Sequence, residues 1–239
     1  MSETYRELQK RIVNKLGYDA DQDPRVSIIP IRSDHKNDRA RCLTSVIIPP
    51  DGIAQSIYQT IIEPLKAIEP EHYYYSPESL HLTIKNIKVV SDPPRFTEAD
   101  MQKVDQLFAE LIPRHQAFSY ALDEVVAFKT SVSLIGYCDE RLRELVQALD
   151  AGLHAIGLPD DKQLISHSVF FGNMTLSRYV HHPSEHFLAG VRRLSNACHW
   201  ELKASLIHLI ICNAVCAPDS RTIVNSYELQ ERKKTIKFA

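Results

Sequence analysis

Two stretches decide the fold: SPESLHLTIK, residues 76–85, and FFGNMTLSR, residues 170–178. Each contains a polar residue, a spacer, a threonine and an apolar residue, HLTI at 81–84 and NMTL at 173–176. The two segments look like one motif written twice about ninety residues apart, with asparagine in the second copy where the first has histidine. Paired His-x-Thr segments suggest acid–base chemistry on a phosphate ester, so the altered second copy leaves an enzyme and a binding protein both open.

Length and composition place the chain among ordinary globular proteins. It has 239 residues, a net charge of −2, 44% apolar and 24% charged residues, which fits one large domain or two small ones. The N-terminus has no signal-peptide core, and no run approaches a membrane helix, so we expect a cytoplasmic protein that does not enter a membrane. Five cysteines, an odd number, argue against a disulfide framework. Cys212 and Cys216 lack the second cysteine pair of a zinc knuckle, so apolar, buried thiols are expected there.

Hydrophobic periodicity predicts a similar order of elements in the two halves of the chain. Helices are expected at residues 3–17, 53–68, 97–112, 139–156 and 184–196. Strands are expected at residues 41–48, 79–90, 117–128, 131–137, 168–178, 201–215 and 222–230. Each half offers a strand, a helix and a strand with a threonine motif, so we expect one pseudo-twofold α+β domain over residues 41–239. Residues 1–40 are expected to add an N-terminal helix and a connecting arm.

The first motif suits a phosphate ester. Side chains at i and i+2 of a strand share one face, so His81 and Thr83 point the same way while Leu82 and Ile84 face the interior. The hydroxyl can hold a phosphate oxygen while the imidazole moves a proton, because its pKa lies near neutrality. A symmetric partner would supply the second proton transfer, and neither step needs a metal.

The sequence around both motifs resembles the two-histidine (2H) phosphoesterases, which include 2′-5′ RNA ligase-like proteins and cyclic nucleotide phosphodiesterases. Residues 76–85 resemble the first family signature, pro-x-x-leu-his-x-thr-leu-lys, and residues 170–178 the second, pro-his-x-thr-leu-x-arg. The resemblance covers roughly residues 41–230. It implies a bilobal fold in which two antiparallel sheets, with helices outside, face a central cleft.

The resemblance also implies roles for single residues. It makes His81 the first catalytic histidine and Thr83 and Thr175 phosphate contacts, with no cofactor and no metal. Asn173 stands at the second histidine position; its amide can hydrogen-bond a phosphate oxygen but cannot exchange a proton near neutral pH. Losing one general acid or base typically slows a reaction 10²–10⁴-fold. Gly172 replaces the usual proline.

Charged and aromatic residues near the motifs extend the predicted site. Lys85 and Arg178, with Lys88, are positioned to line the cleft and attract phosphate, although exposed strand ends often carry such charges. Tyr75, in the run Tyr73 to Tyr75, could stack on a base, whereas a half-buried strand is the competing interpretation.

Other histidines could replace the missing imidazole. His167 lies six residues before Asn173, about 20 Å along an uninterrupted strand. His208 is read mainly as a satisfied buried histidine. His182 and His186 have metal-ligand spacing if helical, but with Pro183 between them a solvated loop is the better interpretation.

Three hypotheses follow: a working phosphoesterase on RNA or nucleotides, a weakened relative that binds a phosphate ester or RNA end without fast turnover, and an interaction protein that keeps only the scaffold. The oligomeric state is left open by the sequence.

Overall fold

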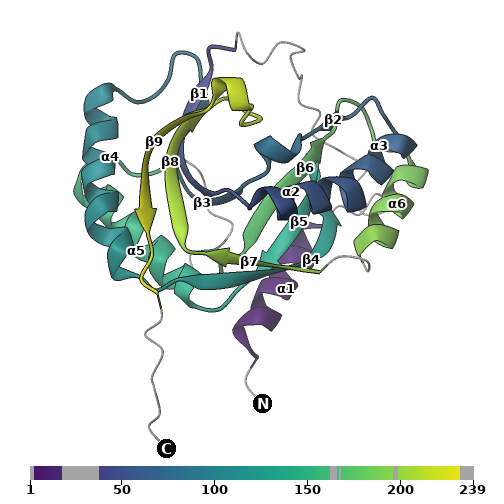
Figure 1. The fold of residues 1–239 in the computed structure, drawn as a ribbon, viewed down its shortest axis with the longest axis horizontal. Coiled ribbons are helices and arrows are strands. Elements are labelled where there is room, and N and C mark those ends of the chain that lie inside the picture. Colours follow the sequence, from purple (N-terminus) through teal and green to yellow (C-terminus); the bar gives the residue numbers. More distant parts are fainter. Residues whose placement is uncertain (1–2, 18–37, 162–165, 167, 196–198, 232–239) are drawn as a thin grey trace, which may run out of the picture.

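Two antiparallel sheets form the centre of the protein (Figure 1). The structure, a computed structural model, describes residues 3–17, 38–161, 166, 168–195 and 199–231. The first sheet has the order β3 (Leu82–Ser91), β1 (Arg41–Ile47), β8 (Leu206–Cys212) and β9 (Thr222–Glu228). The second has the order β2 (Tyr73–Tyr74), β6 (Gly172–Arg178), β5 (Ser131–Tyr137), β4 (Phe118–Ala127) and β7 (Trp200–Ala204). Neighbouring strands in both sheets are antiparallel, as predicted.

Helices flank the sheets on two sides. The helices are α1 (Tyr5–Leu16), α2 (Asp51–Ile57), α3 (Glu63–Ile68), α4 (Glu98–Leu111), α5 (Arg141–Ala155) and α6 (Glu185–Ser195). Figure 1 shows α4 beside α5 at one flank and α3 beside α6 at the other. A π-helical turn, Tyr58–Ile62, joins α2 to α3. The helix predicted at 53–68 is therefore one continuous helical segment, and it begins at Asp51.

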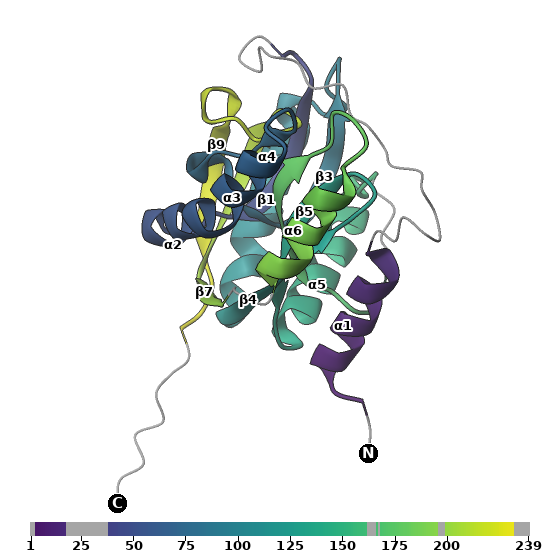
Figure 2. The same cartoon turned by 90° about the vertical axis from the view of Figure 1, so that its right-hand side faces the viewer.

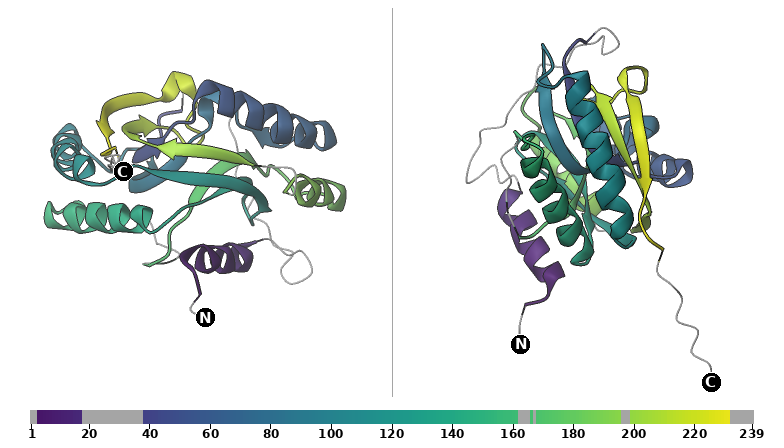
Figure 3. Two further views of the ribbon diagram at one scale, coloured as in Figure 1. Left: turned by 60° about the horizontal axis from the view of Figure 1, so that its bottom comes forward. Right: turned by 90° about the vertical axis from the view of Figure 1, so that its left-hand side faces the viewer.

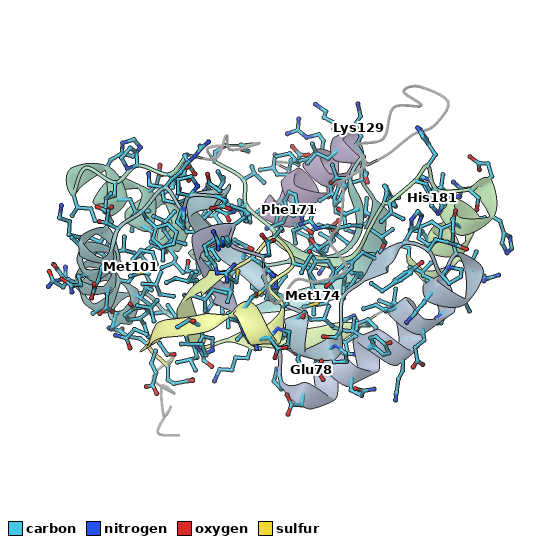
Figure 4. All side chains as sticks on the ribbon, turned by 90° about the horizontal axis from the view of Figure 1, so that it is seen from above. Glu78, Met101, Lys129, Phe171, Met174 and His181 are labelled. Atoms are coloured by element: carbon cyan, nitrogen blue, oxygen red, sulfur yellow. The ribbon has the colours of Figure 1, made fainter. Side chains whose placement is uncertain are left out.

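The N-terminal helix packs on the second sheet, on the side away from α2 (Figures 2 and 3). Val13 is fully buried against Ile135 and Tyr137 of β5. The side chain of Gln9 donates a 2.6 Å hydrogen bond to the carbonyl of Phe170, so α1 holds the segment that leads into the second motif. Phe171 lies beside this helix (Figure 4). Most of the predicted connecting arm, residues 18–37, lies outside the described residues.

Most predicted elements are confirmed, but the prediction of one long strand at 201–215 is wrong. The chain leaves the second sheet at the end of β7 and enters the first sheet at β8, two residues later. Buried positions are Leu202 and Ala204 in β7 but Ile207 and Leu209 in β8. Because side chains alternate between the faces of a strand, this change of phase cannot occur within one regular ladder.

The two sheets are not built from the two halves of the chain. The first sheet combines β1 and β3 with the C-terminal β8 and β9, and the second takes β2 from the N-terminal half. This interleaving puts β3, which follows the first motif's histidine, beside β6, which carries the second motif. Among the described residues no helix is long and apolar enough to cross a membrane.

Candidate functional site

One cavity of about 500 Å³ is lined by both motifs. His81 and Thr83 reach it from the start of β3, and Asn173 and Thr175 reach it from β6. The apolar partners in each motif point the other way: Leu82 and Met174 have no exposed surface. The alternation predicted from the sequence therefore directs both threonines into a shared space between the sheets.

The position of His81 is set by a short turn. Residues Pro77–Ser79 form a 3-10 turn, so β3 begins at Leu82, later than the strand predicted at 79–90. The ring nitrogen Nδ1 of His81 hydrogen-bonds the carbonyl oxygen of Ser79 at 2.8 Å. A carbonyl can only accept, so Nδ1 carries a proton in this arrangement.

The second partner of His81 is a thiol. The side chain of Cys216 lies next to the imidazole at the wall of the same cavity. Burial alone would lower the pKa of His81, but Cys216 and the Ser79 carbonyl raise it above its usual value. Cys216 and the Ser79 carbonyl thus favour the protonated form of the ring, whereas burial disfavours it.

Cys216 belongs to a cluster of three thiols that sequence reasoning did not predict. Cys42 and Cys212 face each other across β1 and β8, with their sulfurs 3.4 Å apart, and Cys216 packs in the same buried cluster. All three line the cavity. The prediction that these cysteines are buried is confirmed. The only sequence signal for the cluster was that three cysteines end or begin apolar runs.

Asn173 is exposed to the cavity, and the residue before it is constrained by packing. A Cβ atom added at Gly172 would lie 2.9 Å from the ring of Tyr120 and 3.1 Å from Leu82. Glycine is therefore required by close approach at this position. This contact links the second motif directly to the residue that follows His81.

Arg178 and Tyr75 both line the cavity and contact each other. The Nε of Arg178 donates a 2.8 Å hydrogen bond to the Tyr75 hydroxyl, and the guanidinium lies 6.0 Å from the ring centre. Tyr75 is only 1% exposed, and its ring contacts Tyr73 edge-on. Tyr73 and Tyr74 form β2, in agreement with the strand interpretation. The structure thus gives Tyr75 the position of a support for Arg178 rather than that of an open stacking platform.

Lys85 lies along the cavity but is bound to carboxylates. Its Nζ is 2.7 Å from Asp150 and 2.5 Å from Asp160, and the residue is 2% exposed. Two ion pairs neutralise the ammonium that the sequence suggested would attract phosphate. Lys88 donates a hydrogen bond to the carbonyl of Pro159.

The other histidines do not join the motifs. His208 hydrogen-bonds Ser226 of β9 at 2.8 Å, so it is satisfied as predicted, but it is only half-buried rather than buried. His182 and His186 are exposed, and His167 lies outside the described residues. Within the described part of the chain, the one group able to hold a metal ion is Glu69, His72 and His181, with ligand atoms within 4.8 Å of one another. His181 lies at the molecule's edge beside α6 in Figure 4, so this group is separate from the cavity between the motifs.

Several solved structures share this fold, and one of them is described as a phosphoesterase. A phosphoesterase crystal structure and that of Escherichia coli LigT complexed with 3′-AMP each give a TM-score of 0.55 at 16% identity, over 80% of this chain and 99% of theirs. TT0787 of Thermus thermophilus gives 0.55 at 15% identity, over 80% of this chain and 98% of its own. The chain has the LigT fold. No protein-family model and no curated protein matches the sequence.

The alignment with LigT covers about four-fifths of this chain. At 13–16% identity, the shared fold does not by itself assign a substrate or a catalytic residue. Chemical roles in this chain have to be argued from its own residues.

Proposed function

We propose that the cavity between β3 and β6 binds the phosphate of a nucleotide or RNA end, as a 2′,3′-cyclic phosphate or a 2′-5′ linkage. The observation that carries this proposal is the shared cavity of His81, Thr83, Asn173 and Thr175. Two hydroxyls and one amide offer hydrogen bonds to phosphate oxygens, and a protonated imidazole offers positive charge. Arg178, held by Tyr75, adds a fixed guanidinium at the same cavity. LigT, which shares the fold, has been crystallised with 3′-AMP and with ATP.

The same residues support slow rather than fast hydrolysis. Burial lowers the pKa of His81, but Cys216 and the Ser79 carbonyl together raise it above its usual value, which suits a general acid that protonates the leaving oxygen. Asn173 stands where a second proton carrier would activate water, and an amide cannot do this. We therefore assign the chain a metal-independent phosphoesterase reaction weakened by about 10²–10⁴-fold relative to a site with both groups.

Binding is tested with 3′-AMP and 2′,3′-cyclic AMP by calorimetry. Thr83→Val combined with Thr175→Val removes both hydroxyls while keeping the shape of the side chains, so affinity should fall at least tenfold. Thr222→Val, at an exposed position on β9, is the matched control and should bind like the wild type. Equal affinity in all three proteins would mean that phosphate does not bind between the motifs.

Turnover is tested with 2′,3′-cyclic AMP. Hydrolysis should disappear in His81→Ala, and Asn173→His should raise it by restoring a second proton carrier. The specific alternative is a non-catalytic binder, which the exposed amide of Asn173 favours. That alternative is supported if ligand binds, with the threonine dependence above, while wild type and Asn173→His both fail to turn it over.

A further inference from the structure

The turn after β8 carries Cys216, which lines the same cavity as His81. The side-chain oxygen of Asn213 accepts hydrogen bonds from the backbone N–H groups of Val215 and Ala217, both at 3.2 Å. The N–H of Cys216 donates to the carbonyl of Asn213, also at 3.2 Å. Asn213 is 2% exposed, so this turn is a fixed, buried structure that sets the direction of the Cys216 side chain.

Cys216 has a backbone conformation that non-glycine residues rarely adopt. Its φ is +51°, and among the described residues other than glycine it is the one with positive φ. The left-handed region costs an L-residue roughly 1–2 kcal/mol, and such conformations gather at functional sites where surrounding contacts hold them. Here the strained backbone holds the sulfur against the imidazole of His81, at the wall of the cavity.

The surroundings of Cys216 favour its thiolate. Cys212 lowers the pKa of Cys216, and burial raises it. His81 and the positive charge of Arg221 lower the pKa of Cys216 further. Cys216, Cys42 and burial raise the pKa of Cys212, which therefore remains a thiol. The titratable and charged groups around the Cys216 sulfur are His81, Cys42, Cys212, Arg221, Tyr73 and Tyr75.

We propose that Cys216 is a reactive thiolate paired with the His81 imidazolium, and that Cys212 is its resolving thiol, so that the cleft contains a site of reversible oxidation by hydroperoxides. Three geometric features carry this inference. Cys216 packs in one buried cluster with Cys42 and Cys212. All three cysteines line the same cavity as His81, and the left-handed turn fixes the position of Cys216. It goes beyond the proposed function and does not depend on it.

The oxidation proceeds in two balanced steps. The Cys216 thiolate attacks the terminal oxygen of a hydroperoxide, the O–O bond breaks, and the His81 imidazolium protonates the departing alkoxide or hydroxide. Cys216 is then a sulfenic acid. The Cys212 sulfur attacks it, the S–O bond breaks, an S–S bond forms, and the Cys212 proton leaves with the hydroxyl as water. Two electrons pass from the two sulfurs to the peroxide.

The thiolate is tested by alkylation with iodoacetamide, followed by tryptic mapping of the full-length protein. An ordinary thiol gains roughly 75-fold in thiolate between pH 6 and pH 8. The rate for Cys216 should change less than about threefold over this range. Cys138 is the internal control, because burial raises its pKa to about 12 and its rate should climb steeply. His81→Asn should restore at least a tenfold pH dependence to Cys216.

The oxidation is tested with one equivalent of hydrogen peroxide. Cys212 and Cys216 share the tryptic peptide 204–221, which contains no other cysteine, so their disulfide makes this peptide two hydrogens lighter. In Cys212→Ser the reaction should stop at a Cys216 sulfenic acid that dimedone traps. In Cys216→Ser neither product should form, and circular dichroism confirms that both variants fold.

Two results would overturn the inference. One is a Cys216 alkylation rate that follows pH as steeply as that of free glutathione. The other is a disulfide between Cys42 and Cys212, detected as linked peptides, that forms equally in wild type and in Cys216→Ser. Neither result bears on phosphate binding, and loss of phosphate binding would not affect either assay.

Discussion

Replacing Lys85 by methionine should destabilise the protein far more than it weakens phosphate binding. The ammonium is almost fully buried and sits 2.7 Å from Asp150 and 2.5 Å from Asp160. Lys85→Met keeps the aliphatic chain but leaves two carboxylates close together with no counter-charge. Breaking a buried ion pair typically costs 3–5 kcal/mol. Asp150 is 33% exposed and can be hydrated, so we expect the lower end, about 3 kcal/mol.

The measurement is urea unfolding, with thermal unfolding as a second readout. A loss of about 3 kcal/mol lowers the melting temperature of a chain this size by roughly 6–12 °C. Lys88→Met, on the same strand, removes one hydrogen bond to a carbonyl and should cost below about 1 kcal/mol. Lys85→Met combined with Asp150→Asn and Asp160→Asn should recover most of the loss, because no uncompensated charge remains. Wild-type stability of Lys85→Met with a tenfold loss of 3′-AMP affinity would show instead that the ammonium serves the ligand.

Three further predictions concern stability. Gly172→Ala should cost about 1–3 kcal/mol because its Cβ would lie 2.9 Å from Tyr120, whereas the added Cβ of Gly52→Ala meets no atom within 4 Å and should not destabilise the protein. Equal urea midpoints for the two variants would contradict the close approach at Gly172. Thr97→Ala removes the capping-box hydrogen bonds of α4 and should cost about 1 kcal/mol in urea unfolding, and an unchanged midpoint would mean that the cap contributes nothing. Burial lowers the pKa of His72 below the unfolded value of 6.5, so its contribution to stability is complete above about pH 6.5 and is lost as pH falls toward the folded pKa. His72→Gln should therefore lose less unfolding free energy than the wild type between pH 7.5 and 5.5, and an identical loss in both proteins would refute this.

The sequence was sufficient for the elements that carry a strong local pattern. The alternation around Thr83 and Thr175 predicted which side chains face the cavity, and the apolar periodicity of residues 97–112 predicted α4 to within a residue at each end. The end of β7 was not visible in a local pattern, because Leu202, Ala204 and Leu206 alternate without a break in the sequence. Only the structure shows that Leu206 is exposed while Ile207 is buried.

Partners from distant parts of the chain could not be read from local patterns. Lys85 follows the first motif at the spacing of a phosphate ligand, yet its ammonium is neutralised by Asp150 from α5 and by Asp160, 65 and 75 residues downstream. Nothing in the residues near Lys85 indicates those carboxylates. Only the packing of α5 against β3 brings Asp150 to it.

The side chains around His81 also come from distant parts of the chain, and they change the chemistry of its imidazole. Because β1 lies between β3 and β8, antiparallel pairing puts Cys42 opposite Cys212, although 170 residues separate them. The turn beyond β8 then carries Cys216 to the imidazole. The group that sets the charge of His81 thus comes from the end of the first sheet and not from the second motif across the cleft. An acid–base description built on the two motifs alone would give His81 a symmetric partner in the second motif. The structure instead places Cys216 beside it, and Cys216 raises the pKa of the ring against the effect of burial.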